Sequence, residues 1–517
     1  MKKYSFLLGL SFVLFSFFIV SCTEDKMDKI NEDKNHPQDV DAKFIVTEIL
    51  TSTAFNVVGA DLSFYASMYI EHEVGVFGQM YSAEIRNVSP SSSSTYNNQW
   101  NAAYTNIQNA KIVISKCSEG GSETEKKSTL GVAQIMLAYN AAVLTDLFGD
   151  TPFSEAGDLN LTKQPKLDKQ EDIYKDVMSY LDEAISNLQG ADNTLGNQDV
   201  IYKGSSNSWI KAAYALKARY TMRLLYRSAN RTQDLNNILT YISKSFASPD
   251  EELKYNLYDG ANASNPYFSL YADRDYLGAS QSFLNKLVSR NDPRAAELYM
   301  IPDWEQITDP AEINAAPNGN PIELQDHYDM SVIVGAQTAP THLISYHELK
   351  FIEAEALCRL NRISDAEVAL KEAITAAFAN LANSIHAAVN SPLLLNYGGI
   401  EAETTLDDPQ VAEDYFDDSV KPLFDANPLR ETMIQKYLGL YGANGEVLEV
   451  YNDYRRLQAL GEASFIQLDN PLNSTKFPLR YSYGTSDVSA NLNVKEAYGD
   501  KGQYVYTEKV WWAGGTR

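Results

Sequence analysis

The residue with the most definite chemical context in this sequence is Cys22. An apolar run extends from Ser5 to Val20, and the residues Ile19-Val20-Ser21-Cys22 resemble a bacterial lipobox. The run is shorter than the roughly 20 residues that a membrane-spanning helix needs, and its layout is that of a secretory signal. The sequence therefore predicts cleavage before Cys22 and acylation of its sulfur and its new amino group. An uncleaved anchor or an ordinary signal peptide is the alternative.

No familiar catalytic signature accompanies this cysteine. The sequence contains no H-E-x-x-H, no G-x-S-x-G, no phosphate-binding loop and no glycine-rich dinucleotide fingerprint. His342 and His347 do not have the spacing that places two metal ligands on one helix face. Carboxylate pairs such as Asp407-Asp408 are frequent in so acidic a chain, and they do not by themselves define a glycosidase site. We therefore expect no enzymatic activity, no cofactor and no metal site.

Charge and composition exclude further classes of protein. The 517 residues include 68 Asp and Glu against 43 Lys and Arg, which gives a formal net charge of −25. This excess argues against nucleic-acid binding, which needs a basic surface, and against lying flat on anionic lipid.

Besides Cys22 the chain contains Cys117 and Cys358. These two could form a disulfide in an exported protein, but we expect buried free thiols.

Aromatic side chains are frequent in segments that lack helical periodicity. The chain has 33 tyrosines, and Tyr96, Tyr267, Tyr271, Tyr276 and Trp304 all lie outside the periodic segments. The ring of tyrosine or tryptophan has a flat apolar face and a polar edge, which suits stacking on the C–H face of a sugar. The same residues can also fill the seams between helices in a large α-helical protein. The sequence leaves both interpretations open.

The rest of the chain is dominated by helical periodicity, and these helices must position the aromatic loops. Apolar residues recur at spacings of three and four. The periodic segments lie at about 97–118, 127–190, 206–226 and 345–378. The last of them contains two helices around a short break, with alanines where the helices would cross, as in a tetratricopeptide unit. The predicted fold is mostly α, with tetratricopeptide-like helical repeats decorated with long irregular loops.

Two of the expected helices carry sequence signals for their first turns. Ser364 and Glu367 have the spacing of a capping box, in which a hydroxyl and a carboxylate satisfy the free N–H groups of a helix start. Asp168 and Glu171 have the same spacing before the helix that begins near residue 170. We expect both pairs to cap these helices.

The domain organisation follows from these patterns. Residues 1–21 are the predicted signal peptide. Residues 22–39 are charged and nearly devoid of apolar side chains, so we expect a lipidated N-terminus and a flexible tether. Residues 40–517 form the helical body, with a loop-rich insertion at about 255–345 that is rich in Tyr, Asn, Asp and Pro.

Five stretches of the sequence resemble the SusD/RagB family of nutrient-binding outer-membrane lipoproteins, within its divergent SusD-like branch. The most specific is LTDLFGDTPFSEA at 144–156, which is similar to the family pattern TDxxGDxPYxEA. The stretches follow the order expected for the family and span almost the whole chain after the signal peptide. The other four are Cys22 with 30–37, the segment 199–223, the run 353–356, and 435–437 leading to 451–456.

The resemblance implies a location and a function. Such proteins lie on the outer face of the outer membrane of Gram-negative bacteria of the Bacteroidetes type, and Glu24 and Asp25 resemble their surface-export signal. Each pairs with a SusC-like TonB-dependent transporter barrel and acts as a hinged lid that captures an oligosaccharide, or sometimes a peptide. No enzyme activity belongs to the family. The alternatives are a structural lid without a ligand site of its own and a surface glycoside hydrolase.

A ligand groove of the family type would lie on the loop before the 97–118 helix and on the 255–310 part of the insertion. The identity of the ligand does not follow from the sequence. We predict the contact residues by loop position rather than by a matched motif: Tyr96, Tyr276 and Trp304 for stacking, and Arg86 and Asn98 as partners of sugar hydroxyls.

Overall fold

The computed structural model describes residues 40–87, 95–157, 161–190, 192–442, 445–499, 502 and 504–517. The helices and strands of these residues lie in one compact unit, Ala42–Arg517. Most of this unit is helical, which confirms the predicted fold class. Cys22 and the predicted signal peptide and tether lie outside the described residues.

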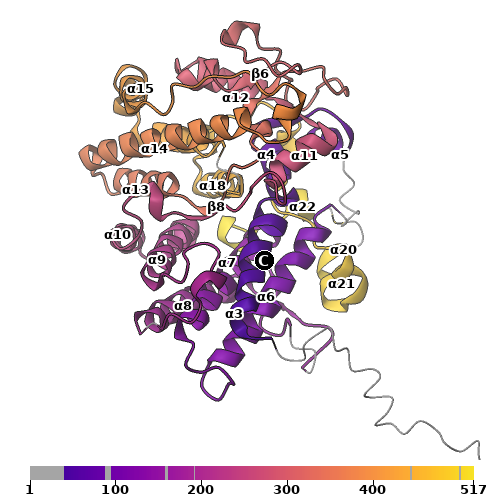
Figure 1. The fold of residues 1–517 in the computed structure, drawn as a ribbon, viewed down its shortest axis with the longest axis vertical. Coiled ribbons are helices and arrows are strands. Elements are labelled where there is room, and N and C mark those ends of the chain that lie inside the picture. Colours follow the sequence, from indigo (N-terminus) through magenta and orange to yellow (C-terminus); the bar gives the residue numbers. More distant parts are fainter. Residues whose placement is uncertain are drawn as a thin grey trace, which may run out of the picture. The chain divides into compact units, whose positions relative to one another are not determined.

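The helical array runs in chain order, and each helix packs on the next one (Figure 1). Helix α10 then packs on α13 across the long insertion that separates them in sequence. Such pairwise stacking buries an apolar stripe on both sides of each inner helix. The helices of the array are α3 (Ala42–Ser52), α6 (Asn97–Cys117), α7 (Lys127–Phe148), α8 (Gln170–Gln189), α9 (Ser206–Arg223), α10 (Arg231–Ile242), α13 (Tyr346–Arg359) and α14 (Ile363–Val389).

Helix α7 is the centre of the array. Its residues are buried from Ser128 to Phe148, because α6 and α8 cover its opposite sides. A helix that is apolar on all sides must be enclosed by other elements or by lipid. The length and composition of α7 would also suit a membrane span, but its most apolar window is entirely buried in the protein. We therefore assign it to the core.

Both predicted helix caps are wrong. Helix α14 begins two residues earlier than expected, with Arg362 at the N-cap position and no side-chain cap, so Ser364 lies inside the first turn. Helix α8 follows Lys169, which provides no side-chain cap either. The Asp168 carboxylate instead accepts hydrogen bonds from the backbone N–H groups of Phe153 and Ser154, at 2.8 and 2.9 Å. It therefore fixes the loop at the end of the 144–156 stretch.

The insertion is less irregular than its composition suggests. Strand β4 (Leu253–Tyr255) pairs antiparallel with β8 (Thr341–Ile344), and this pairing joins the two ends of the insertion. Strand β5 pairs antiparallel with β1 (Glu73–Gly75), which follows α4 (Asp61–Tyr69) near the N-terminus of the unit. The elements inside the insertion include α11 (Pro266–Arg274), β5 (Leu277–Ala279), α12 (Gln281–Val288), β6 (Tyr299–Met300) and β7 (Met330–Ser331).

The C-terminal part returns to the array. Helix α17 packs on α13 and α14, whereas α18 packs on α4 and also contacts α9. In this way the part of the chain after residue 409 connects the array with the N-terminal segment (Figure 1). Its helices are α15 (Pro409–Tyr415), α16 (Lys421–Ala426), α17 (Pro428–Gly439), α18 (Val447–Leu460), α19 (Asn473–Lys476), α20 (Thr485–Ala490), α21 (Leu492–Tyr498) and α22 (Tyr504–Thr507).

A buried network of ion pairs joins these helices. The Arg456 guanidinium of α18 donates to both carboxylate oxygens of Glu355 on α13, at 2.6 and 2.7 Å, and to Asp453 at 2.9 Å. Lys436 of α17 lies 2.6 Å from the second oxygen of Asp453. Buried charges are tolerated only when they are paired in this way. Further buried pairs are Arg219 with Glu348 and Arg223 with Asp146 and Glu449.

The glycine in the middle of the 144–156 stretch ends α7. Gly149 has a φ of 79°, which a residue with a side chain rarely adopts. A Cβ atom there would also lie 2.5 Å from the guanidinium of Arg480, which donates to the Phe148 carbonyl. The Thr145 hydroxyl donates to the Gly149 carbonyl at 2.8 Å. The stretch therefore connects α7 to the C-terminal segment.

Cys117 and Cys358 form no disulfide, which confirms the expected free thiols. Cys117 is buried on α6, whereas the half-buried Cys358 on α13 has its sulfur 3.6 Å from the Thr432 hydroxyl. Burial raises the pKa of both thiols, so both are protonated at neutral pH.

Candidate functional site

Trp304 lies in the insertion next to α11, and its ring is fixed by a tyrosine of that helix. Its indole Nε1–H donates a hydrogen bond of 2.6 Å to the Tyr271 hydroxyl, and both side chains are half-buried. Trp304 has a φ of 70°, an uncommon conformation for so bulky a residue. Backbone hydrogen bonds to Ile301 and from Glu401 hold it there. Strained backbone of this kind is concentrated at functional positions.

Tyr276 forms a second aromatic contact, at the start of β5. Its ring centroid lies 5.6 Å from that of Phe77, and both rings are half-buried. The Tyr276 carbonyl accepts a hydrogen bond of 2.8 Å from the N–H of Val76, which extends the pairing of β1 with β5. Gly78 permits this approach, because a Cβ there would lie 3.1 Å from the Tyr276 ring. We call Phe77, Tyr271, Tyr276 and Trp304 the aromatic group.

Tyr96 does not share this partial exposure. It is 6% exposed and stacks on Tyr481, with ring centroids 4.1 Å apart and planes inclined by 9°. Its hydroxyl lies 2.9 Å from that of Tyr69. With its ring covered by protein, Tyr96 cannot stack on a sugar in this conformation. The position after a serine-rich loop suggested exposure, but partners from remote parts of the sequence enclose the ring.

The two predicted hydroxyl partners lie in different environments. Arg86 is buried, and its guanidinium donates to the carbonyls of Ala83 and Glu84 and to the Asn473 side chain, at 2.9 to 3.1 Å. It therefore serves the local fold rather than a sugar. Asn98 is exposed in the first turn of α6. Of the five predicted residues, the structure leaves Tyr276, Trp304 and Asn98 accessible.

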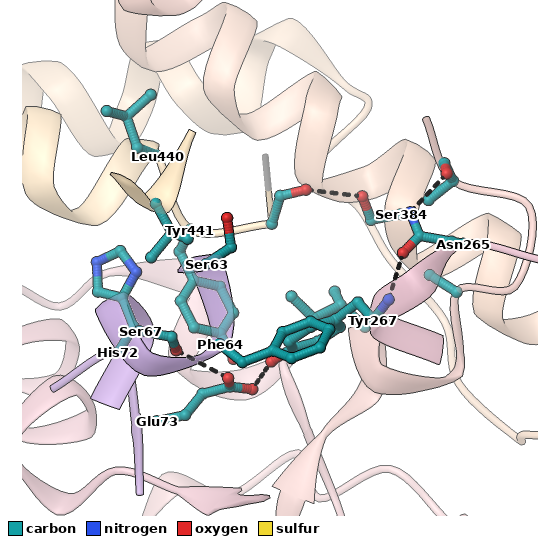
Figure 2. Close-up of a pocket in the computed structure, with 15 residues that line it drawn as sticks. Ser63, Phe64, Ser67, His72, Glu73, Asn265, Tyr267, Ser384, Leu440 and Tyr441 are labelled. Carbon is teal, nitrogen blue, oxygen red and sulfur yellow. Dashed lines mark hydrogen bonds between the residues drawn. The ribbon is translucent and has the colours of Figure 1, made fainter. Parts of the chain in front are cut away.

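A pocket lies between α4, β1, α11 and the end of α17 (Figure 2). Glu73 is its central polar residue, and its carboxyl group accepts hydrogen bonds from the Ser67 hydroxyl at 2.8 Å and from the Tyr267 hydroxyl. Asn265 caps α11, because its side chain accepts from the Tyr267 N–H at 2.8 Å and donates to the Ala339 carbonyl at 2.8 Å.

This pocket is too small for a sugar. Its volume is about 50 Å³, whereas ligand pockets usually measure roughly 300–1,000 Å³. A buried water needs about 10–15 Å³, so a few waters fit. The side chains that line the pocket therefore connect the neighbouring elements, and the pocket is not a ligand site.

Burial determines the protonation of the groups in this pocket. It raises the pKa of Glu73 to about 8, with the Ser67 hydrogen bond acting in the opposite direction. It also lowers the pKa of His72 to about 3, although the hydrogen bond to the Tyr437 carbonyl opposes this shift. At neutral pH both side chains are therefore mainly uncharged.

The raised pKa of Glu73 predicts a loss of stability at high pH. The folded-state pKa of about 8 lies above the ordinary value of 4.5, so the folded protein retains a proton that the unfolded chain releases. The stabilisation from this proton is complete below pH 4.5 and is lost as the pH rises through 8. We expect Glu73→Gln, which cannot ionise, to be more stable than wild type at pH 9 by a few kcal/mol, on the order given by the shift. Urea unfolding at pH 5 and pH 9 measures this difference, and an equal difference at both values would contradict it.

The sequence did not indicate that Phe77 and Glu73 contact the insertion. Phe77 follows a short strand with no periodic signal, so nothing in the sequence indicated its contact with Tyr276. Glu73 belongs to the run Glu71-His72-Glu73, which carries no local signal for a contact with the insertion. Among the residues that the structure describes, no three His, Cys, Asp or Glu side chains are placed to hold a metal ion.

The chain was compared with known protein families and solved structures. Residues 34–484 match the model of the SusD-like family described as "starch-binding associating with outer membrane". A SusD/RagB family protein from Bacteroides thetaiotaomicron is 49% identical, with 93% of this chain and 100% of that chain aligned and a TM-score of 0.87. No curated protein matches significantly.

More distant structures share the fold. A protein described as chitin-binding is 18% identical, with 92% of this chain and 100% of that chain covered and a TM-score of 0.67. A chitin-binding SusD homologue from Flavobacterium johnsoniae is 16% identical, with coverages of 92% and 99% and a TM-score of 0.65. The family match over most of the chain and the close structural relative lead to one conclusion. This chain belongs to the SusD-like family of starch-binding proteins that associate with the outer membrane.

Proposed function

We propose that this protein is a cell-surface lipoprotein that captures an oligosaccharide and acts as the lid of a SusC-like TonB-dependent transporter in the outer membrane. Membership of the SusD-like family supports the association with the outer membrane and a carbohydrate ligand. The aromatic group is the observation that carries the ligand part of the proposal. It offers four half-buried rings: Tyr271, Tyr276 and Trp304 lie in the 255–310 part of the insertion, where a binding surface was expected, and Phe77 lies beside Tyr276.

The chemistry of these rings suits a glycan. The face of an aromatic ring covers the C–H side of a sugar ring. The polar edge of the aromatic ring remains available to the hydroxyl groups of the sugar. The Tyr271 hydroxyl is already held by Trp304, so the two rings are ordered before a ligand arrives. Such order reduces the entropy that binding must remove. The description of two distant structural relatives as chitin-binding also favours a saccharide over a peptide.

Acylation of Cys22 would attach this binding unit to the membrane. A single acyl chain gives only marginal membrane binding, whereas several chains anchor a protein stably. We infer that the anchor keeps the lid beside its transporter barrel, so that ligand capture and import occur at one place. The charged segment that follows Cys22 would provide the distance that a hinged lid requires.

Replacement of the anchor residue tests the location and the role together. We expect Cys22→Ser to move nearly all of the protein out of the outer-membrane fraction and to reduce uptake of a fluorescent oligosaccharide by intact cells to the level of a deletion strain. Purified Cys22→Ser protein should bind the same oligosaccharide as wild type. Membrane fractionation, uptake and calorimetry measure these three quantities.

Cys358→Ser is the matched control, because its thiol is half-buried and distant from any signal sequence. It should leave both location and uptake unchanged. Retention of Cys22→Ser in the membrane of a strain without the transporter would contradict the lipid anchor. Normal uptake without measurable ligand binding would favour a structural lid, and release of reducing sugar by the purified protein would favour a hydrolase.

A further inference from the structure

The rings of the aromatic group come from three backbone segments: Phe77 follows β1, Tyr271 and Tyr276 both lie in 266–276, and Trp304 lies farther along the insertion. Tyr276 and Phe77 are held by the pairing of β1 with β5, in which Glu73 faces Ala279 and Gly75 faces Leu277. Tyr271, the hydrogen-bond partner of Trp304, belongs to α11. A ligand that contacts all four rings needs these segments in a fixed relative position.

Glu73 joins β1 to α11. It belongs to β1 and is 3% exposed, and its carboxyl group accepts the hydroxyl hydrogen of Tyr267 on α11 (Figure 2). Tyr267 lies one helical turn before Tyr271, so the two side chains project from the same face of α11. The second carboxyl oxygen accepts from Ser67 on α4. One side chain thus connects α4, β1 and α11.

We propose that Glu73 is the positioning residue of the aromatic group, which it holds in its binding arrangement by fixing α11 against β1 through Tyr267. This inference rests on the proposed capture of a saccharide, because it assigns a role in that binding. Glu73 does not itself face the ligand, since it is enclosed in a pocket that has room only for water.

The surroundings of Glu73 make this contact sensitive to ionisation. The titratable groups near it are Tyr267 on α11, His72 beside it, Tyr299 on β6 and Tyr441 after α17. No lysine or arginine of the described residues contributes to its pKa, which burial raises to about 8. An ionised Glu73 would therefore be a buried charge without a cationic partner among the described residues, supported only by the hydroxyl groups of Ser67 and Tyr267. Its cost is relieved if water enters or α11 moves.

Hydrogen–deuterium exchange of residues 266–276 tests the positioning role without any ligand. We expect Glu73→Ala to increase exchange in this segment about tenfold, the effect of losing one buried hydrogen bond, and Tyr267→Phe to increase it similarly. Glu73→Gln retains groups that can bond to both hydroxyls and should exchange like wild type. The matched control is Tyr174→Phe, which removes a buried tyrosine–carboxylate hydrogen bond to Asp146 in the array.

The pH profile separates positioning from a general effect on packing. After correction for intrinsic rates, exchange of 266–276 in wild type should increase between pH 7 and pH 9, whereas in Glu73→Gln it should stay constant. Unchanged exchange in both Glu73→Ala and Tyr267→Phe would overturn the proposal. Identical pH profiles of wild type and Glu73→Gln would overturn its ionisation part.

Calorimetry with an oligosaccharide that wild type binds completes the test. Glu73→Ala and Tyr267→Phe should weaken binding about tenfold, and Glu73→Gln should bind like wild type. Equal affinities for all variants would overturn the link between Glu73 and the ligand surface. If wild type binds no saccharide, the proposed function fails, whereas the exchange experiment still decides whether Glu73 positions α11.

Discussion

Replacing Arg456 by methionine is expected to lower the free energy of unfolding by about 3–5 kcal/mol, the usual cost of removing one partner of a buried ion pair. The Arg456 guanidinium is fully buried and lies 2.6 and 2.7 Å from the two carboxylate oxygens of Glu355. Methionine fills most of the volume but leaves the carboxylates of Glu355 and Asp453 with fewer partners. Urea unfolding at pH 7 measures the loss.

An exposed ion pair provides the control for this prediction. Arg362 pairs with Asp365 at 2.6 Å, but more than half of each side chain is exposed. Arg362→Met should therefore change the free energy of unfolding by less than about 1 kcal/mol. Equal effects of Arg456→Met and Arg362→Met would show that the buried network does not stabilise the fold.

The buried pair of Arg456 and Glu355 also predicts a loss of stability in acid. Burial by itself would raise the pKa of Glu355, but the charges of Arg456 and Arg359 and the hydrogen bonds from Arg456 together outweigh it, and the pKa is lowered to about 2. The stabilisation is thus present above the ordinary pKa of 4.5 and is lost as the pH falls through 2. The difference between wild type and Arg456→Met should decrease accordingly in acid.

Replacing Trp304 by alanine is expected to weaken binding of the saccharide ligand by about 1–3 kcal/mol, by analogy with the stacking of nucleic-acid bases on aromatic side chains. This corresponds to a loss of affinity of roughly 5- to 150-fold. The substitution removes both the ring and the hydrogen bond that orients Tyr271. Calorimetry of the purified proteins measures the change, and circular dichroism checks that the helical fold is retained.

Two conservative variants separate stacking from orientation. Trp304→Phe retains an aromatic face without an N–H donor, and Tyr271→Phe retains the second ring without its hydroxyl acceptor. If stacking dominates, both should lose much less affinity than Trp304→Ala. An affinity of Trp304→Ala equal to that of wild type would remove Trp304 from the ligand surface.

The helical array could be predicted because its signal is local. Apolar spacings of three and four around Ala366 and Leu370 on α14 are sufficient to indicate a buried helix face. Helix starts were less predictable, because a capping sequence competes with other bonds. Asp168 has the position of a cap but bonds to the backbone of Phe153 and Ser154 instead.

The candidate site depended on contacts that no local pattern records. Tyr96 stacks on Tyr481, and Arg86 bonds to Asn473, in each case across nearly 400 residues of sequence. Sequence position placed both residues near loops, but only the fold shows that their partners enclose them. Trp304 and Tyr276 remained accessible because their partners, Tyr271 and Phe77, cover only part of each ring.

The most direct test of the proposed function is a glycan array probed with wild type and with the double variant Trp304→Ala/Tyr276→Ala. We expect that wild type binds at least one class of oligosaccharide and that the double variant, with an unchanged circular-dichroism spectrum, binds it at least tenfold more weakly. Absence of binding to any glycan, or equal binding by both proteins, would contradict saccharide capture by the aromatic group.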